Sequence, residues 1–231
     1  MLESTHKLIG FSLATAEGDI GEIKDFYFDD QNWNIRYLVV ETGNWLFGRK
    51  VLISPYAILG ISQEKKIVKV NMTKDQVKSS PAIDTDLPVS KQLEKKINDY
   101  YAWPHYGSAG MGYPTTGMIK VSKAVKSDAY DNSTADKHLR SYRHVRDYKV
   151  YNSNGFLGET ADFLVSTMHW TIPYLIIEAD ENRDDELFAI PTNKIASIDF
   201  SNFAVSLTLT KAQLERISEI NLNPEHGEDI F

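Results

Sequence analysis

The sequence predicts an all-β protein made of two small β-barrels that are related by an internal repeat. Three observations lead to this fold class. The segment WNIRYLVVE at 33–41 returns almost unchanged as WTIPYLIIE at 170–178. Short apolar runs alternate with Gly, Asp and Asn turns in both halves, a pattern typical of strands. The chain has 231 residues, which is long enough for two small domains.

The repeat extends well beyond these nine residues. Residues 18–41 align without a gap with residues 155–178, and the register returns between LISPYAILGI and FAIPTNKIASI and between VNMTKDQV and LTLTKAQL. Since a repeat of this length indicates two copies of one structural unit, Trp33 and Trp170 should occupy equivalent places. Other identical pairs are Gly18/Gly155, Gly21/Gly158, Glu22/Glu159, Asp25/Asp162, Phe26/Phe163, Tyr37/Tyr174 and Glu41/Glu178.

The elements of the first copy follow from its apolar runs and turn residues. Thr73 is expected to cap a short helical turn that ends at residue 78. The run at 35–41 is apolar on both faces, which predicts a small barrel whose outer wall is covered by another segment. We expect turns at 16–19 and 29–32, and strands at 8–13, 20–28, 35–41, 50–55, 57–63 and 66–72.

These motifs resemble the PRC-barrel family. The resemblance rests on the Gly18 to Gly21 turn, on IGEIKDFYFDD and WNIRYLVVETGNWLFGRKVLISP, and on their second-copy counterparts. The family includes the cytoplasmic part of the photosynthetic reaction-centre H subunit and the C-terminal barrel of ribosome-maturation factors. The resemblance implies two tandem barrels and no catalytic residue, because the family's motif contains none.

The chain divides into four segments. We expect a first barrel at 1–80, a connecting strap at 81–138, a second barrel at 139–217 and a tail at 218–231. In the strap, VSKQLEKKINDYYAW predicts a short helix with Leu93, Ile97 and Tyr100 or Tyr101 on one face. The segment WPHYGSAGMGYPTTG that follows predicts irregular structure. Because a plain linker would be polar, this aromatic strap should pack either on the barrels or on a partner.

Composition excludes several classes of protein. The absence of cysteine removes disulfides, thiolate catalysis and Cys-based metal sites. Residues 100–119 carry no Lys, Arg, Asp or Glu, but Pro104, Pro114 and four glycines argue against a membrane helix there. The first residues contain no apolar run typical of a signal peptide. We therefore expect a cytoplasmic protein with no transmembrane segment.

The net charge of −7 is unevenly distributed. Residues 1–88 carry −2, residues 89–150 carry +5 and residues 151–231 carry −10. A nucleic-acid binder usually has a basic face, and only the middle segment is basic, so we expect no direct contact with nucleic acid. The basic middle is either a solvated surface or a segment that docks on the acidic C-terminal part, in the same chain or in a second copy.

Candidates for catalytic or metal chemistry have simpler structural explanations. GSAGMG at 107–112 follows no strand and opens no helix, so turn chemistry explains it better than phosphate binding. The six histidines are scattered without acidic partners at ligand spacing. The carboxylates Glu22, Asp25 and Glu41 are repeated in the second copy; Glu22 and Asp25 lie just past a tight Gly turn that both copies need, so a structural role explains the repetition. We expect no catalytic, cofactor-binding or metal-binding residue.

The segment TGNWLFGRK after the third strand differs between the copies, since the second copy has ADENRDDE at this place. An exposed Trp-Leu-Phe tip would be an interaction site, although packing within the protein is an equal alternative. With the strap aromatics, the predicted interaction surface comprises Trp45, Leu46, Phe47, Trp103, Tyr106 and Tyr113.

The sequence therefore favours a non-enzymatic binding or scaffold protein that has a protein partner and forms a homo-oligomer. Resemblance to the H subunit implies peripheral contact with a photosynthetic or other membrane complex. Resemblance to the maturation factors implies a ribosome- or RNA-processing-associated factor instead. The alternatives are a small-ligand or metal-binding regulatory module with a pocket between the barrels, and an enzyme with a convergent cluster of carboxylates or histidines.

Overall fold

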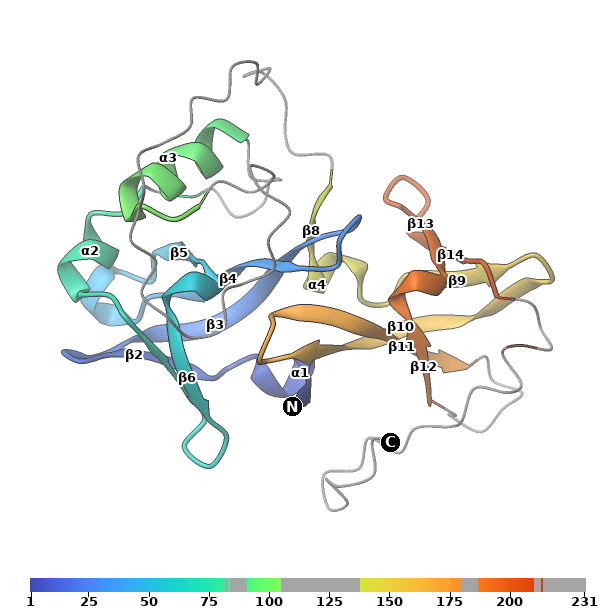
Figure 1. Cartoon of the computed structure of the whole chain (residues 1–231), viewed down its shortest axis with the longest axis horizontal. Coiled ribbons are helices and arrows are strands. Elements are labelled where there is room, and N and C mark those ends of the chain that lie inside the picture. Colours follow the sequence, from blue (N-terminus) through green and yellow to red (C-terminus); the bar gives the residue numbers. More distant parts are fainter. Residues whose placement is uncertain (82, 84–90, 105–137, 180–186, 210–212, 214–231) are drawn as a thin grey trace. The chain divides into compact units, whose positions relative to one another are not determined.

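The computed structural model describes residues 1–81, 83, 91–104, 138–179, 187–209 and 213 (Figure 1). These residues form two seven-stranded sheets and a few short helices. The predicted fold class, mainly β with two barrel-like domains, is confirmed. Among the described residues, no helix combines the length and the apolar character needed to cross a bilayer.

The first sheet follows the order β5-β4-β3-β2-β7-β6. Its neighbouring strands are antiparallel except for the parallel pair β2 and β7. A seventh strand, β8 (Leu139–Ser141), pairs with β3. The other strands are β2 (Ser12–Thr15), β3 (Gly18–Asp29), β4 (Ile35–Glu41), β5 (Lys50–Ile53), β6 (Ile58–Ser62) and β7 (Ile67–Val70).

The second sheet repeats this topology strand for strand, in the order β12-β11-β10-β9-β14-β13. It again contains one parallel pair, β14 with β9. Its seventh strand, β1 (Leu2–Ser4), pairs with β10. The other strands are β9 (Lys149–Asn152), β10 (Gly155–Ser166), β11 (Thr171–Ala179), β12 (Leu187–Pro191), β13 (Ile195–Asp199) and β14 (Ala204–Leu207).

Two compact units result, and neither is contiguous in sequence. One unit comprises Lys7–Arg140 with Thr167–Trp170, and the other comprises Met1–His6, Ser141–Ser166 and Thr171–Phe231. Each unit therefore contains one sheet together with a short strand that precedes the other repeat in the chain.

The chain before each repeat differs from the prediction. The strand expected at 8–13 begins only at Ser12, because Thr5–Leu8 form a short helix, α1, that buries Leu8 completely. The same combination of strand and helix recurs in the second repeat as β8 and α4 (Tyr142–Val145). Three-residue strands have no readable periodicity, so the sequence gives no sign of β1 or β8.

The predicted cap at Thr73 is confirmed. Its hydroxyl accepts a hydrogen bond from the Gln76 amide at 3.1 Å, and the Gln76 side chain accepts one from the Thr73 amide at 2.8 Å. This reciprocal pair begins α2 (Lys74–Lys78). Two single 3-10 turns, η1 (Asn44–Leu46) and η2 (Pro55–Ala57), lie on either side of β5, and a third, η4 (Thr192–Lys194), follows β12.

The predicted strap helix is α3 (Lys91–Tyr101), which covers the outer face of the first sheet. Ile97 of α3 is buried in one cluster with Tyr27, Tyr37, Val39 and Leu52 of the sheet. Leu139 of β8 completes this cluster. The alternate residues Leu38 and Val40 are fully buried as well, so both faces of β4 lie in apolar surroundings. This cover explains why the run at 35–41 is apolar on both parities.

Trp33 and Trp170 share a backbone conformation in the turn after the long strand, although Trp170 is buried and Trp33 is half-buried. Both have left-handed backbones, with φ of 55° and 53°, at the tip of the hairpin that follows the long strand. Left-handed φ is uncommon for a residue as large as Trp, so its presence at both sites shows that the two hairpins turn in the same way. Trp33 also stacks on Phe28, with ring centres 5.5 Å apart.

The repeated glycines Gly21 and Gly158 lie where two strands approach too closely for any side chain. Their φ values are +149° and +151°. A Cβ on Gly21 would lie 2.2 Å from the Glu41 carbonyl oxygen, and one on Gly158 would lie 1.9 Å from that of Glu178. Both the conformation and the contact therefore require glycine.

We expect Gly21→Ala and Gly158→Ala each to lower the free energy of unfolding by about 2–3 kcal/mol, because the backbone must shift to admit the methyl group. Urea denaturation followed by circular dichroism measures the change. Gly60→Ala is the matched control, since Gly60 has open space around its Cβ position and no left-handed φ. Equal stability of the Gly21→Ala and Gly60→Ala proteins would refute the steric explanation.

Candidate functional site

The loop between β4 and β5 is closed by its own hydrogen bonds. At its neck, the amide and the hydroxyl of Thr42 both donate to the Arg49 carbonyl, at 2.8 and 2.7 Å. The Arg49 amide donates to the Leu46 carbonyl at 3.1 Å, and the Gly48 amide to the Gly43 carbonyl at 3.3 Å. The loop therefore has a defined shape without support from a partner.

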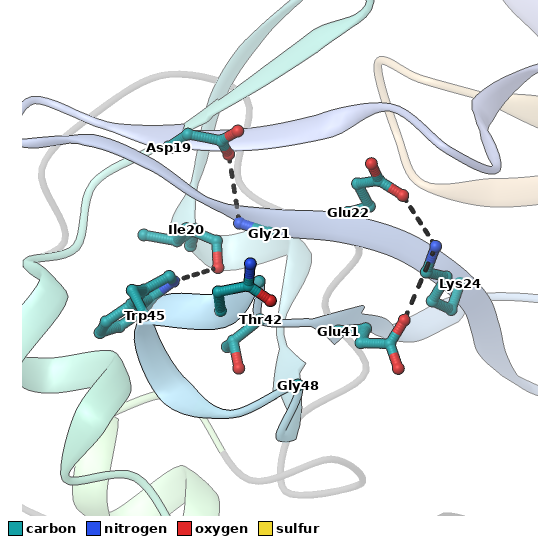
Figure 2. Close-up of a pocket in the computed structure, with 11 residues that line it drawn as sticks. Asp19, Ile20, Gly21, Glu22, Lys24, Glu41, Thr42, Trp45 and Gly48 are labelled. Atoms are coloured by element: carbon teal, nitrogen blue, oxygen red, sulfur yellow. Dashed lines mark hydrogen bonds and ion pairs between the residues drawn. The ribbon is translucent and has the colours of Figure 1, made fainter.

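Trp45 fastens this loop to the sheet. Its indole Nε1–H donates to the Ile20 carbonyl of β3 at 2.9 Å (Figure 2). The Lys74 ammonium of α2 lies 5.7 Å from the centre of the indole ring, in cation–π range. Trp45 is half-buried and acts as the anchor of the loop on β3.

Phe47 is the exposed tip of the loop. Its side chain is 97% exposed, whereas Trp45 and Leu46 are half-buried. Its backbone is left-handed, with φ 57° and ψ 33°. This conformation costs a residue with a Cβ about 1–2 kcal/mol. The loop therefore exposes a large aromatic side chain to solvent. The same residue has a strained backbone conformation.

A pocket of about 410 Å³ adjoins the loop. Strand β3, the end of β4 and the loop itself form its wall (Figure 2). The lining residues are Asp19, Ile20, Gly21, Glu22, Lys24, Glu41, Thr42, Gly43, Asn44, Trp45 and Gly48.

The charged wall of the pocket centres on Lys24. Its ammonium lies 2.7 Å from Glu22 and 3.7 Å from Glu41 (Figure 2). The hydrogen bond with Glu22, followed by the charges of both carboxylates, raises the pKa of Lys24. With Asp19 the wall holds three carboxylates and one ammonium, which suits a cationic group of a partner.

This combination is specific to the first repeat. The position of Lys24 corresponds to Ala161 in the second repeat, and the loop corresponds to ADENRDDE. Residues 180–186 of that second loop lie outside the described residues. Within the part of the chain that the structure describes, this loop with its adjoining pocket belongs to the first repeat.

Trp103 of the predicted surface belongs to the cluster under α3 and not to the loop. Trp103 stacks on Tyr101, with ring centres 4.2 Å apart and planes at 20°, and packs against the cluster under α3. Tyr106 and Tyr113 lie outside the described residues, as does the GSAGMG segment. The structure therefore groups Trp45, Leu46 and Phe47 in one loop and places Trp103 against the first sheet.

The repeated aspartates hold backbone groups. Asp25 accepts a hydrogen bond from the Phe26 amide at 2.8 Å, and Asp162 accepts the equivalent bond from Phe163 at the same distance. Both lie at a shift in strand register, where the ladder of backbone hydrogen bonds is locally irregular. Their recurrence therefore follows from this bulge and not, as the sequence suggested, from the Gly turn.

Lys24 and Asp19 were missed as site residues by the sequence interpretation. A usable signal was the pairing of Glu22 with Glu41, which lie directly opposite each other on β3 and β4. Like charges in that position are unfavourable unless a cation lies between them. Lys24 follows Glu22 by two residues and supplies that cation. Among the described residues, no three His, Asp or Glu side chains lie together as a metal site would require.

A buried polar cluster joins α3 to the first sheet. Arg36 of β4, 5% exposed, pairs with Asp29 at 3.5 Å and with Glu94 of α3. The Tyr37 hydroxyl lies 2.9 Å from Glu94 and 3.1 Å from Asn98. Burial, followed by the charge of Glu94, raises the pKa of Tyr37 well above its usual value of 10. These contacts join the side chains of α3 to β4 and thereby hold α3 on the first sheet.

Comparison with known families matches residues 2–77 to the PRC-barrel domain. The match covers the first repeat, from β1 to α2, and shows the predicted resemblance for that copy. The second copy is linked to it by the internal alignment and by the identical strand order. A comparison with curated proteins gives no match.

The protein should lose stability as the pH rises above about 10. In the unfolded chain Tyr37 ionises near pH 10, whereas in the folded protein it keeps its proton to a much higher pH. Between these values the unfolded state binds fewer protons, so the free energy of unfolding falls by up to about 1.4 kcal/mol per pH unit. Tyr101, with a pKa raised by burial to about 12, adds to the same loss.

Urea denaturation at pH 9, 10 and 11 measures this slope. Tyr37→Phe should be less stable at pH 9, because it lacks the hydroxyl that contacts Glu94, but should lose less stability between pH 10 and 11. Parallel pH profiles for the wild type and Tyr37→Phe would show that Tyr37 does not titrate as expected.

Proposed function

We propose that this protein is a non-enzymatic binding protein that engages a protein partner through the loop 43–48 and the adjoining pocket of its first repeat. The observation that carries this proposal is Phe47, 97% exposed on a left-handed backbone. The resemblance of residues 2–77 to the PRC-barrel domain supports a binding or scaffold role in general.

The energetics of the tip favour such a role. In the free chain, the strain at Phe47 and the exposure of its ring both oppose stability. A partner that buries the ring gains about 1.5–3 kcal/mol from its apolar surface. The hydrogen-bonded neck at Thr42 and Arg49 keeps the loop in its binding shape, so little ordering is needed on association.

The residues of the loop and the pocket indicate which side chains a partner would present to them. An apolar cleft would receive Phe47, and a basic side chain at its rim would reach the carboxylates of Asp19, Glu22 and Glu41. Because residues 1–88 carry −2 and residues 151–231 carry −10, a protein partner fits better than RNA. The partner that we propose, following the resemblance to the H subunit, is a protein of a membrane complex to which this chain binds peripherally.

Affinity purification with matched variants tests this function. Tagged protein would be recovered from its host after gentle solubilisation of membranes, and co-purifying proteins would be quantified by mass spectrometry. Phe47→Ser should lower recovery of a stoichiometric partner more than tenfold, as expected when an anchor residue is lost. Its melting temperature should not fall, because the ring makes little contact within the chain.

Leu59→Ser is the matched control, since Leu59 is an apolar residue of the same unit and 69% exposed. It should retain the partner. Equal recovery with Phe47→Ser and Leu59→Ser would contradict the proposed site. Recovery of the protein alone, with a lower mass in solution for Phe47→Ser, would identify a second copy as the partner and agree with the predicted homo-oligomer.

Small-ligand binding is the second candidate function. The pocket volume of about 410 Å³ is within the usual range for ligand sites, about 300–1,000 Å³. A thermal-shift screen with a small-molecule panel should show no change if the site serves a protein partner. A shift that Lys24→Ala removes would favour the ligand instead.

A further inference from the structure

Two short strands each precede one repeat in the sequence but pair with a strand of the other repeat. With the offset of 137 that aligns the repeats, Leu2 and Ser4 of β1 correspond to Leu139 and Ser141 of β8. Yet β1 pairs with β10 of the second repeat, and β8 pairs with β3 of the first. We call β1 and β8 the arm strands.

Each arm strand occupies a vacant edge of a long strand. Strand β9 pairs with β10 only over Gly155–Glu159. Beyond that point β1 continues the pairing, with Ser4 opposite Leu164 and Leu2 opposite Ser166. Without β1, the backbone groups of this part of β10 would lack strand partners on that side.

Side chains make the fit of the first arm specific. The Thr5 hydroxyl, fully buried, donates to the Phe163 carbonyl at 3.0 Å. The Ser4 hydroxyl and the His6 amide both donate to the Asp162 carboxylate, the latter at 3.2 Å. Tyr142 also donates to Asp162, at 3.0 Å. One buried carboxylate of the second repeat thus binds the arm of the first.

The second arm is fixed to the first sheet by ionic contacts. The Asp30 amide donates to the His138 carbonyl at 3.0 Å. The Asp30 carboxylate lies 2.9 Å from His138 Nδ1 and 2.5 Å from Arg140 Nε. The two arms therefore fill equivalent edges by different side-chain contacts.

We propose that the edge along the carboxyl-terminal half of each long strand is a binding site for the arm of a second copy of the repeat. In this chain both copies are present, and each repeat completes the sheet of the other. The halves 1–104 and 138–231 are thus mutual binding partners that associate through arm exchange and need no peptide connection. This inference does not rest on the proposed function.

Proteolytic cleavage of the chain between the two halves tests the proposal. A protease recognition sequence inserted after Gly117, outside the described residues, allows the full-length folded protein to be cut once. The two fragments should elute together in gel filtration at the volume of the uncut chain. Fragments that elute separately as folded species would overturn the proposal.

The variant Thr5→Val tests whether the arm strand β1 and the adjoining Thr5 cause the two fragments to associate. It replaces one buried hydroxyl by a methyl group. The dissociation constant of the two fragments should therefore rise about tenfold. Thr15→Val is the matched control, because the Thr15 hydroxyl donates to the Gly18 carbonyl at an exposed turn away from the arm. Both variants carry the same insertion, so any effect of the insertion cancels. Equal dissociation constants for the two variants would overturn arm exchange.

Discussion

The length of the long strand in each repeat is the constraint on which the rest of the structure depends. Strands β3 and β10 each have twelve residues, whereas the neighbours β2 and β9 have four. Such a strand leaves backbone groups without partners on one edge, and the arm strands supply them. The glycine that lets the next strand approach closely and the aspartate that accepts a backbone hydrogen bond at the bulge both belong to this strand.

Sequence divergence between the two copies gives the first repeat contacts that the second repeat does not share. Strand order is the same in both sheets, but Arg36 is replaced by Pro173 and Lys24 by Ala161. Arg36 holds α3 on the first sheet, and Lys24 organises the charged wall of the pocket. The apolar core therefore preserves the repeat, while polar positions on β3 and β4, such as buried Arg36 and partly exposed Lys24, carry what is specific to each copy.

The fold was predictable from sequence because repetition and apolar alternation are local signals. The cover on β4 was predictable for the same reason, since it leaves both faces apolar. The arm strands were not predictable, because Leu2–Ser4 form a strand only against β10. For the site, Trp45, Leu46 and Phe47 stood out by their apolar character. Lys24 required the register of β3 against β4, which depends on a bulge that the sequence does not reveal.

Hydrogen exchange measured by mass spectrometry tests most directly the claim that the long strand is completed by the other repeat's arm. The full-length protein is compared with a protein that lacks Met1–His6. The account predicts that the amides of residues 162–168 lose protection on deletion of the arm, while those of β3 keep theirs. Unchanged protection at 162–168 would contradict it, because β10 would then be complete without the arm.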